Sequence, residues 1–267
     1  MQKLPLPAKP TYVVGSVDRA LKLLQMLRDH GHVRLRAAAC ELGVAESTVH
    51  RLLAMLVYRG FAVQDASHVY LPGPALGVGP TRITWTRELR DISIPHMELL
   101  SGHTGESVNL VVRVGTKIHF LWGQEGSNIF RIVSREGAVL PARSTAAGKV
   151  LLADLTEERL RRLYQGTSAE LHNEILPEPE FQLLLRNLRL NRKNGYATGK
   201  EGTEMGVSAI AMALRDRDGR VIAAFAVAVP VTRFDALVTP HMLQVLKATQ
   251  QDIEEDLRES GVRSSAG

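Results

Sequence analysis

The chain has 267 residues, of which 45% are apolar, 23% charged and 5% aromatic. This composition is that of a globular protein with room for more than one core, and it excludes disordered, collagen-like and coiled-coil classes. The longest apolar run, 221–229, is shorter than the roughly 18 residues that a membrane span requires. The single Cys40 and a proline-rich start without a secretory signal predict a cytoplasmic protein without disulfides.

Positive charge is concentrated near the N-terminus. Residues 1–80 carry nine Lys and Arg against five Asp and Glu, whereas the remainder carries 24 against 23. Seven of the nine basic residues lie between Arg19 and Arg59. This distribution predicts a polyanionic partner for the N-terminal third, with a solvated charged surface as the alternative.

The N-terminal third is predicted to fold as a winged helix-turn-helix. After a flexible tail over 1–15, Ser16 is expected to cap a helix that stops at Gly31. The elements expected next are a short helix over 35–42, a helix over 46–58, and a hairpin of two strands over 61–64 and 68–71.

The two short helices are separated as in a helix-turn-helix. Small Ala39 allows their close approach, and Gly43 accepts the positive φ of the turn. A helical hairpin with no role in DNA binding would share these positions. It would not need hydrogen-bonding side chains at the start of its second helix, which suit base edges and phosphates in a major groove. The residues predicted to contact DNA are Arg19, Arg34, Arg36, Ser47, Thr48, His50, Arg51 and His68.

Three single residues in this region have their own interpretations. For Arg51 the sequence leaves three interpretations open: a contact to a phosphate, a contact to a guanine, or a side chain that lies along its own helix. His68 contacts a phosphate or is a solvated turn residue. Cys40 has no nearby His or Asp and is predicted to be a small buried thiol.

The rest of the chain is predicted to form a linker helix over 75–90, a second domain over 91–259 and a flexible tail over 260–267, after a first domain over 16–74. Helices are expected over 81–89, 93–104, 145–153, 156–164, 178–194 and 239–259. Strands are expected over 108–114, 118–122 and 128–133, near Tyr196, and in a hairpin of 207–214 with 221–229. Because strands and helices do not alternate strictly, the fold class is α+β with an antiparallel sheet.

The last predicted hairpin alternates alanine with bulky residues. The alanines are Ala209, Ala211, Ala213, Ala224, Ala226 and Ala228. Since strand side chains alternate between faces, one face of the hairpin is almost entirely alanine. That face either receives a closely packed helix or leaves space for a ligand.

No residue pattern typical of an enzyme is found. The sequence has no His-Glu-x-x-His motif, no cysteine pair and no Gly-x-Ser-x-Gly elbow. The segment 195–201 is one residue short of a P-loop and ends in Glu201, where Ser or Thr must hold magnesium. We therefore expect no catalytic residues, no metal and no cofactor.

Several segments, taken in order, resemble the IclR family of bacterial transcriptional regulators. They are Gly15–Leu21, Ser47–Leu53, Leu140–Lys149, Gly195–Tyr196 and Asp216–Arg220, and the resemblance spans roughly 16–234. It implies a winged helix-turn-helix joined to a GAF-like effector-binding domain. It also implies a homodimer or dimer of dimers that binds a palindromic operator in double-stranded DNA and responds to a small metabolite, often an organic or aromatic acid.

The resemblance further implies an effector site. The matching residues are Ser144, Thr145, Ala146, Ala147, Gly199, Ala209, Ala226 and Ala228. Family members often carry an acid at the position of Gly199, a cysteine at that of Ala209, and serines at those of Ala226 and Ala228. Without these polar groups, we expect an effector larger and less polar than a two- or three-carbon keto acid. Its anionic end would meet the amides near Ser144 or the side chain of Arg143.

Together these features predict a cytoplasmic, ligand-responsive regulator of a catabolic operon, acting as repressor or activator, and not an enzyme. Two alternatives come from other classes. A GAF-like small-molecule enzyme with a DNA-binding domain would turn over a substrate. An architectural DNA-binding dimer would have no ligand that alters operator binding.

Overall fold

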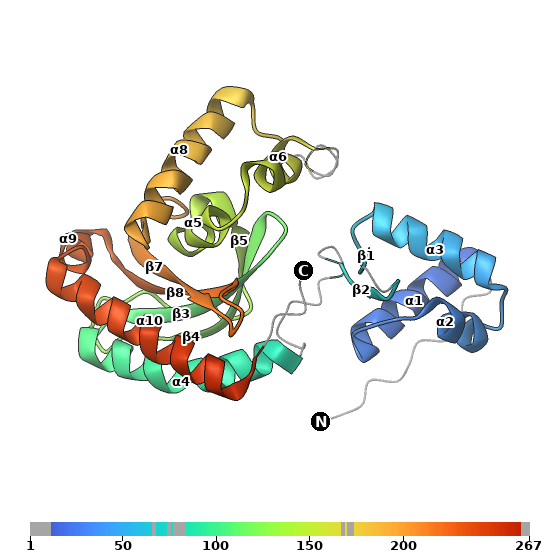
Figure 1. The fold of residues 1–267 in the computed structure, drawn as a ribbon, viewed down its shortest axis with the longest axis horizontal. Helices are drawn as coiled ribbons and strands as arrows, with labels where there is room; N and C mark the ends of the chain where they lie inside the picture. Colours follow the sequence, from blue (N-terminus) through green and yellow to red (C-terminus); the bar gives the residue numbers. More distant parts are fainter. Residues whose placement is uncertain are drawn as a thin grey trace. The chain divides into compact units, whose positions relative to one another are not determined.

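The computed structural model describes residues 12–65, 68–73, 76, 84–166, 169 and 174–262. The chain divides into two compact units, Met1–Gly79 and Pro80–Gly267 (Figure 1). The predicted tail up to residue 11, the hairpin tip at 66–67, and residues 75 and 77–83 of the predicted linker lie outside the described residues.

The N-terminal unit is a winged helix-turn-helix, as predicted. Its described elements are α1 (Gly15–His30), α2 (Leu35–Leu42), α3 (Glu46–Tyr58), β1 (Ala62–Gln64) and β2 (Tyr70–Pro72). The turn between α2 and α3 places Gly43 at a φ of 62°, which glycine adopts without strain. Val49 and Leu53 of α3 are buried in one core with Leu27 and Ala39. β1 and β2 pair antiparallel and form the wing.

Two local predictions in this unit are wrong. Helix α1 begins at Gly15, inside the predicted tail, with Val14 rather than Ser16 at its N-cap. Cys40 is exposed, because Ala38 and Ala39 occupy the inward face of α2 and the following residue turns away from the core.

The second unit is an α+β fold around one sheet. Its described elements are α4 (Thr84–Thr104), β3 (Ser107–Val114), β4 (Lys117–Gln124), β5 (Val139–Pro141), the 3-10 helix η3 (Ala142–Ser144), α5 (Ala146–Ala153), α6 (Glu157–Gln165), α8 (Glu178–Asn194), β6 (Ala197–Lys200), β7 (Val207–Arg215), β8 (Val221–Pro230), the 3-10 helix η4 (Val231–Arg233), α9 (Phe234–Leu237) and α10 (Pro240–Ser260). The strand order is β5-β4-β3-β8-β7-β6, and all neighbouring strands are antiparallel. None of the described helices combines the length and apolarity of a membrane span.

Helices cover both faces of this sheet (Figure 1). On one face, the bulky side chains of β7 and β8, such as Met212 and Phe225, share a core with α4 and α10. On the other, Ala211 and Ala224 pack with α5 and α8 residues such as Leu151. The alternation therefore sorts the two faces as predicted, and the small side chains let α5 lie close to the sheet.

One predicted strand is absent from the structure. Residues 128–133 belong to the described loop between β4 and β5, and the edge of the sheet is formed by β5, which the sequence did not indicate. This loop has no strand ladder, and hydrogen bonds to side chains fix its conformation instead. The Glu125 carboxylate accepts from Arg131 Nε at 2.8 Å and from the Ser134 amide at 3.1 Å.

Two boundaries also differ from the prediction. The expected helices over 81–89 and 93–104 are one helix, α4, with Pro95 inside it. At the other end, Val262 is buried in the core beneath α10, so the predicted tail over 260–267 does not begin at Ser260. Residues 263–267 lie outside the described part of the chain.

Candidate functional site

The first half of α3 presents polar side chains on its outer surface. Ser47, His50 and Arg51 are exposed and Thr48 is half-buried, while Val49 on the inner face is fully buried. The helix period places these groups on one side because the inner positions anchor α3 in the core. The arrangement suits insertion of α3 into a major groove.

The other residues predicted to contact DNA lie on three elements of the same unit. Arg34 and Arg36 are exposed at the start of α2, and Arg19 of α1 is half-buried. His68 is exposed in the wing at a φ of 58°, with its Nδ1 3.5 Å from Nε2 of Gln64. DNA contact by each of these residues stays a prediction.

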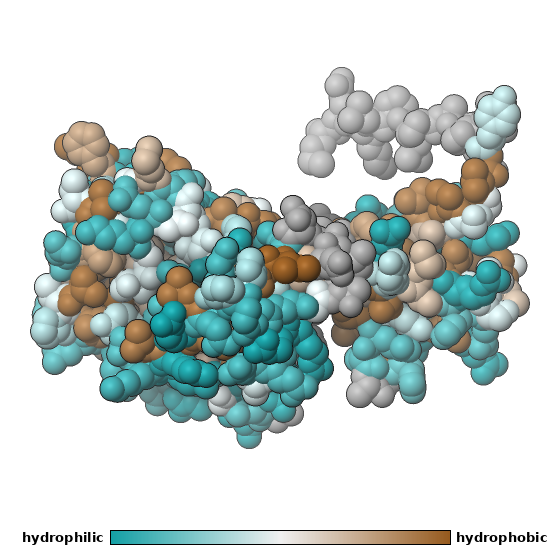
Figure 2. Space-filling model, turned by 90° about the horizontal axis from the view of Figure 1, so that it is seen from above, coloured by the Kyte–Doolittle hydropathy of each residue, from teal (hydrophilic) through white to brown (hydrophobic). Residues whose placement is uncertain are grey.

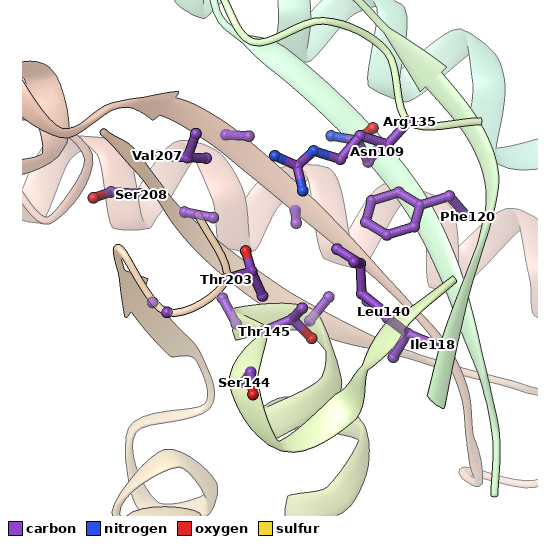
Figure 3. Close-up of a pocket in the computed structure, with 17 residues that line it drawn as sticks. Asn109, Ile118, Phe120, Arg135, Leu140, Ser144, Thr145, Thr203, Val207 and Ser208 are labelled. Carbon is purple, nitrogen blue, oxygen red and sulfur yellow. The ribbon is translucent and has the colours of Figure 1, made fainter. Parts of the chain in front are cut away.

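In the second unit, a pocket opens between the start of α5 and the alanine face of the sheet (Figure 3). All eight residues predicted for an effector site, those at 144–147 and at positions 199, 209, 226 and 228, line this pocket. Its volume is about 60 Å³. A cavity needs about 10–15 Å³ to hold one water molecule, so this pocket has room for a compact ligand. That these residues bind an effector is a prediction.

The start of α5 forms one end of the pocket. Thr145 caps the helix, since its Oγ1 accepts a hydrogen bond from the Gly148 amide at 3.0 Å. The amides of Ala146 and Ala147 fall in the first turn, where a helix supplies no backbone acceptors. They therefore present hydrogen-bond donors at a pocket wall, as a carboxylate requires. Arg143 does not share this role, because it is exposed, lies 4.0 Å from Glu180 and is not in the lining.

Gly148 is expected to be indispensable for this helix start. A Cβ at this position would lie 2.1 Å from the Ala142 carbonyl oxygen and 2.4 Å from its Cα. Both are backbone atoms, so no flexible side chain can yield. We expect Gly148→Ala to lower the free energy of unfolding by about 3 kcal/mol, at the upper end of ordinary overpacking. Thermal and urea unfolding measure the loss.

The control for this variant is Gly199→Ala, at a glycine that lines the pocket beside α5. Its Cβ would lie 3.4 Å from the Ala146 amide nitrogen, which is an ordinary contact. This variant is expected to keep the stability of the wild type. Equal unfolding midpoints for the two variants would contradict the assignment of Gly148 to backbone packing.

The pocket contains polar groups that the sequence analysis missed. Asn109 of β3 is only 3% exposed and lies opposite Ala226 in the neighbouring strand, which places it on the alanine face. Its Oδ1 has no hydrogen-bond partner among the described residues. Arg135 and Thr203 reach the pocket from loops. A polar residue in the apolar run 108–112 was a signal for Asn109, whereas loop residues such as Arg135 follow no period that sequence patterns reveal.

The remaining wall is apolar. Ile118, Phe120 and Leu140 line the side near β4 and β5, while Asn109 and Arg135 gather with Phe120 at the end away from Ser144 and Thr145 (Figure 3). Among the described residues that line the pocket, Arg135 is the only charged one. The described part of the chain holds no cluster of three His, Cys, Asp or Glu side chains that could ligate a metal.

Lys149 links two elements that form the pocket, α5 and β6, although it does not line the pocket itself. Lys149 Nζ on α5 donates to the Thr198 carbonyl oxygen of β6 at 3.3 Å. Burial of this ammonium lowers its pKa, because the charged form loses hydration. The bond holds β6, which carries Gly199, against α5.

Comparisons with known proteins cover both units. Residues 16–66 match the family model of the IclR helix-turn-helix domain, and residues 82–255 match that of the bacterial transcriptional regulator IclR C-terminal domain. The chain is 30% identical to the transcriptional repressor AllR of Salmonella paratyphi A over 86% of this chain and 85% of that protein. It is 29% identical to the transcriptional repressor IclR of Escherichia coli, over 91% and 90% of the two chains.

Solved structures share the fold. The IclR protein of Thermotoga maritima is 25% identical with a TM-score of 0.56, covering 92% of this chain and 100% of that one. An IclR homolog of Microbacterium hydrocarbonoxydans complexed with 4-hydroxybenzoate is 22% identical with a TM-score of 0.57, covering 91% and 99%.

Proposed function

Because the chain belongs to the IclR family of ligand-responsive bacterial transcriptional regulators, we propose that it binds the palindromic operator of a catabolic operon and senses a compact organic acid. The main support for this proposal is that the two units have different functional surfaces. One exposes a polar helix start in a winged helix-turn-helix, and the other holds a pocket where Arg135 is the only charged residue among the described lining residues. We assign 16–74 to DNA binding, 75–90 to linking the domains and 91–259 to effector binding.

The relatives also bear on what the protein does not do and where it acts. The matched proteins are named as repressors and regulators, which supports a binding protein without catalytic activity. A regulator that binds bacterial DNA works in the cytoplasm, and we place this one there. Substrate turnover in the second unit would contradict this assignment.

An exposed apolar stripe on α1 supports a dimer. Tyr12, Val13 and Val14 are exposed before or at the helix start, and Val17 and Leu21 follow at helical spacing with 52% and 54% of their surface accessible. Brown atoms mark apolar surface on the N-terminal unit in Figure 2. One recognition helix covers only a half-site of an operator. A second copy packed on this stripe would supply the second recognition helix, so the dimer could bind both half-sites of a palindrome.

We expect sedimentation at micromolar concentration to show a dimer or a dimer of dimers. Leu21→Glu would place a charge in the apolar stripe and should move the protein toward monomer. Ser16→Glu adds the same single negative charge on α1, at an exposed position outside the stripe. This second variant is expected to sediment like the wild type. A wild-type monomer that occupies one half-site would refute the proposal.

The pocket supports an effector with an apolar body and one acidic end. Alanines and the side chains of Phe120 and Leu140 offer apolar surface, which gains about 25 cal/mol for each Å² buried. The amides at the α5 start and the guanidinium of Arg135 lie at opposite ends of the pocket, and either set of donors suits one carboxylate. The solved relative with 4-hydroxybenzoate carries a ligand of this class.

The test joins the two units in one measurement. A duplex selected from the promoter nearest to the gene is titrated with full-length protein, with and without benzoate, 4-hydroxybenzoate and hexanoate. We expect nanomolar, salt-dependent and sequence-specific binding that at least one acid changes. Absence of sequence-specific binding would overturn the proposed function.

A further inference from the structure

Two loops meet at the pocket through one ion pair. Arg135, between β4 and β5, donates through Nη2 to Oε2 of Glu204 at 2.5 Å, and Glu204 lies between β6 and β7. The side chain of Arg135 is 15% exposed, whereas that of Glu204 is 57% exposed. Arg135 lines the pocket, but Glu204 does not. The cation is therefore part of the pocket wall, and its partner reaches in from the surface.

The pocket offers Arg135 no other anion. The described residues that line it are otherwise uncharged, and within the described chain Glu204 is the only acidic residue paired with Arg135. A sheltered guanidinium strongly favours a carboxylate partner, because charge-assisted hydrogen bonds replace its lost hydration. Glu204 supplies that partner in the structure. Its own exposure lets it return to water at small cost.

The side-chain amide of Asn109 lies at the same end of the pocket as Arg135 (Figure 3). It is buried, and its Oδ1 lacks a partner among the described residues. Buried polar atoms without partners are uncommon because each one costs desolvation energy. Oδ1 accepts hydrogen bonds, so a ligand donor such as a hydroxyl group would satisfy it, whereas a ligand carboxylate at this end would need the donors of Arg135.

The loop that carries Glu204 also touches the opposite end of the pocket. A Cβ on Gly202 would lie 2.5 Å from the Ser144 carbonyl oxygen, so the loop passes closely over the residues that precede α5. Met205, next to Glu204, is 93% exposed. The loop is thus held near the pocket at Gly202 and at Glu204, and its tip is in solvent.

We propose that Glu204 is a tethered substitute for the effector's carboxylate. It occupies Arg135 in the ligand-free protein, and the carboxylate of an organic acid displaces it while the apolar body of the acid lies against Phe120 and the alanine face. This inference rests on the proposed function, since it assigns an effector class and its regulation to the same pocket. The acid can bind Arg135 only while Glu204 is displaced. The apparent affinity for the acid is therefore the intrinsic affinity multiplied by the fraction of time that Arg135 is free of Glu204. The exchange also breaks the bond between the loop that carries Glu204 and the loop that carries Arg135, so occupancy of the pocket changes the surface.

The test compares full-length wild-type protein with Glu204→Gln. Each is titrated with benzoate, 4-hydroxybenzoate and hexanoate, and with benzamide as an uncharged counterpart, by calorimetry and thermal unfolding. We expect Glu204→Gln to bind the acids about fivefold more tightly, the equivalent of about 1 kcal/mol, because an exposed ion pair no longer competes. Binding of benzamide should be the same in both proteins.

Two further variants identify the group that receives the carboxylate. Arg135→Gln should lose the preference for benzoate over benzamide. Glu136→Gln removes the same charge from an exposed residue next to Arg135 that does not line the pocket, and it should bind acids like the wild type.

Three results would overturn the proposal. Unchanged or weaker acid binding by Glu204→Gln would show that Glu204 does not compete. Undiminished acid binding by Arg135→Gln would place the carboxylate at the amides of α5. Failure of all three acids to bind both wild type and Glu204→Gln would exclude this effector class. Failure of the proposed function is separate, because it shows as the absence of sequence-specific DNA binding.

Discussion

Arg51→Ala is expected to weaken operator binding by roughly 1 to 3 kcal/mol, or about 5- to 160-fold. Arg51 is exposed on the first half of α3, on the surface opposite the buried Val49 and Leu53. From there a guanidinium can make two hydrogen bonds to one guanine edge or hold a phosphate. Fluorescence anisotropy with operator and scrambled duplexes over a range of salt concentrations separates these roles. Loss confined to the operator indicates base reading, whereas equal loss on both duplexes with a salt slope reduced by about one indicates a phosphate contact.

Arg59→Ala is the matched control for this variant. Arg59 is also exposed, but it lies at the C-terminal end of α3, where its guanidinium stacks on the Tyr58 ring with a separation of 5.4 Å. Its loss removes the same charge from the end of α3 away from the polar helix start, so operator affinity should fall much less. Equal affinities for wild type and Arg51→Ala would rule out this end of α3 as the DNA-reading surface.

Ala228→Leu is expected to give a protein that binds its operator but no longer responds to an effector. Ala228 lines the pocket and is 7% exposed, so three added carbons enter a space of about 60 Å³. The larger side chain excludes the ligand and costs about 1 to 3 kcal/mol of stability through overpacking. The DNA-binding unit has its own core and should be unaffected. Operator titrations with and without each acid that stabilises the wild type measure the response.

Ala213→Leu serves as the control for added bulk. Ala213 lies on the same alanine face and is half-buried, but it does not line the pocket. A stable Ala213→Leu protein should still respond. If Ala228→Leu responds like the wild type, the alanine face serves only to receive α5, and the pocket is not the effector site.

Local periodicity was sufficient where one face of an element carries the apolar residues. The helix predicted over 178–194 is observed with these bounds, because Phe181, Leu184 and Leu188 repeat at helical spacing and Gly195 ends it at a φ of 79°. The alternation in β7 and β8 likewise predicted both the hairpin and its alanine face. In these segments the pattern that predicts the element is also the pattern that buries it.

The same reasoning failed where apolar residues stay exposed. Ile129, Phe130 and Val133 suggested a strand, but they are exposed in a loop that side-chain bonds hold in place, including one from Arg233 to the Phe130 carbonyl oxygen at 2.7 Å. In α1, Val17 and Leu21 fit the helical period, yet the buried positions are Leu23, Met26 and Leu27. Periodicity counts apolar residues and does not show which of them find a partner in the tertiary structure.

Residue spacing alone predicted the winged helix-turn-helix and the antiparallel α+β sheet, and the family resemblance predicted the eight residues that line one pocket. These depend on local spacing and on motifs of adjacent residues, which a sequence displays directly. The electrostatics of that pocket depends instead on packing between distant segments. Arg135, Glu204 and Asn109 come from separate loops and a strand far apart in the chain, and their pairing, burial and lack of partners arise only when packing brings those segments together.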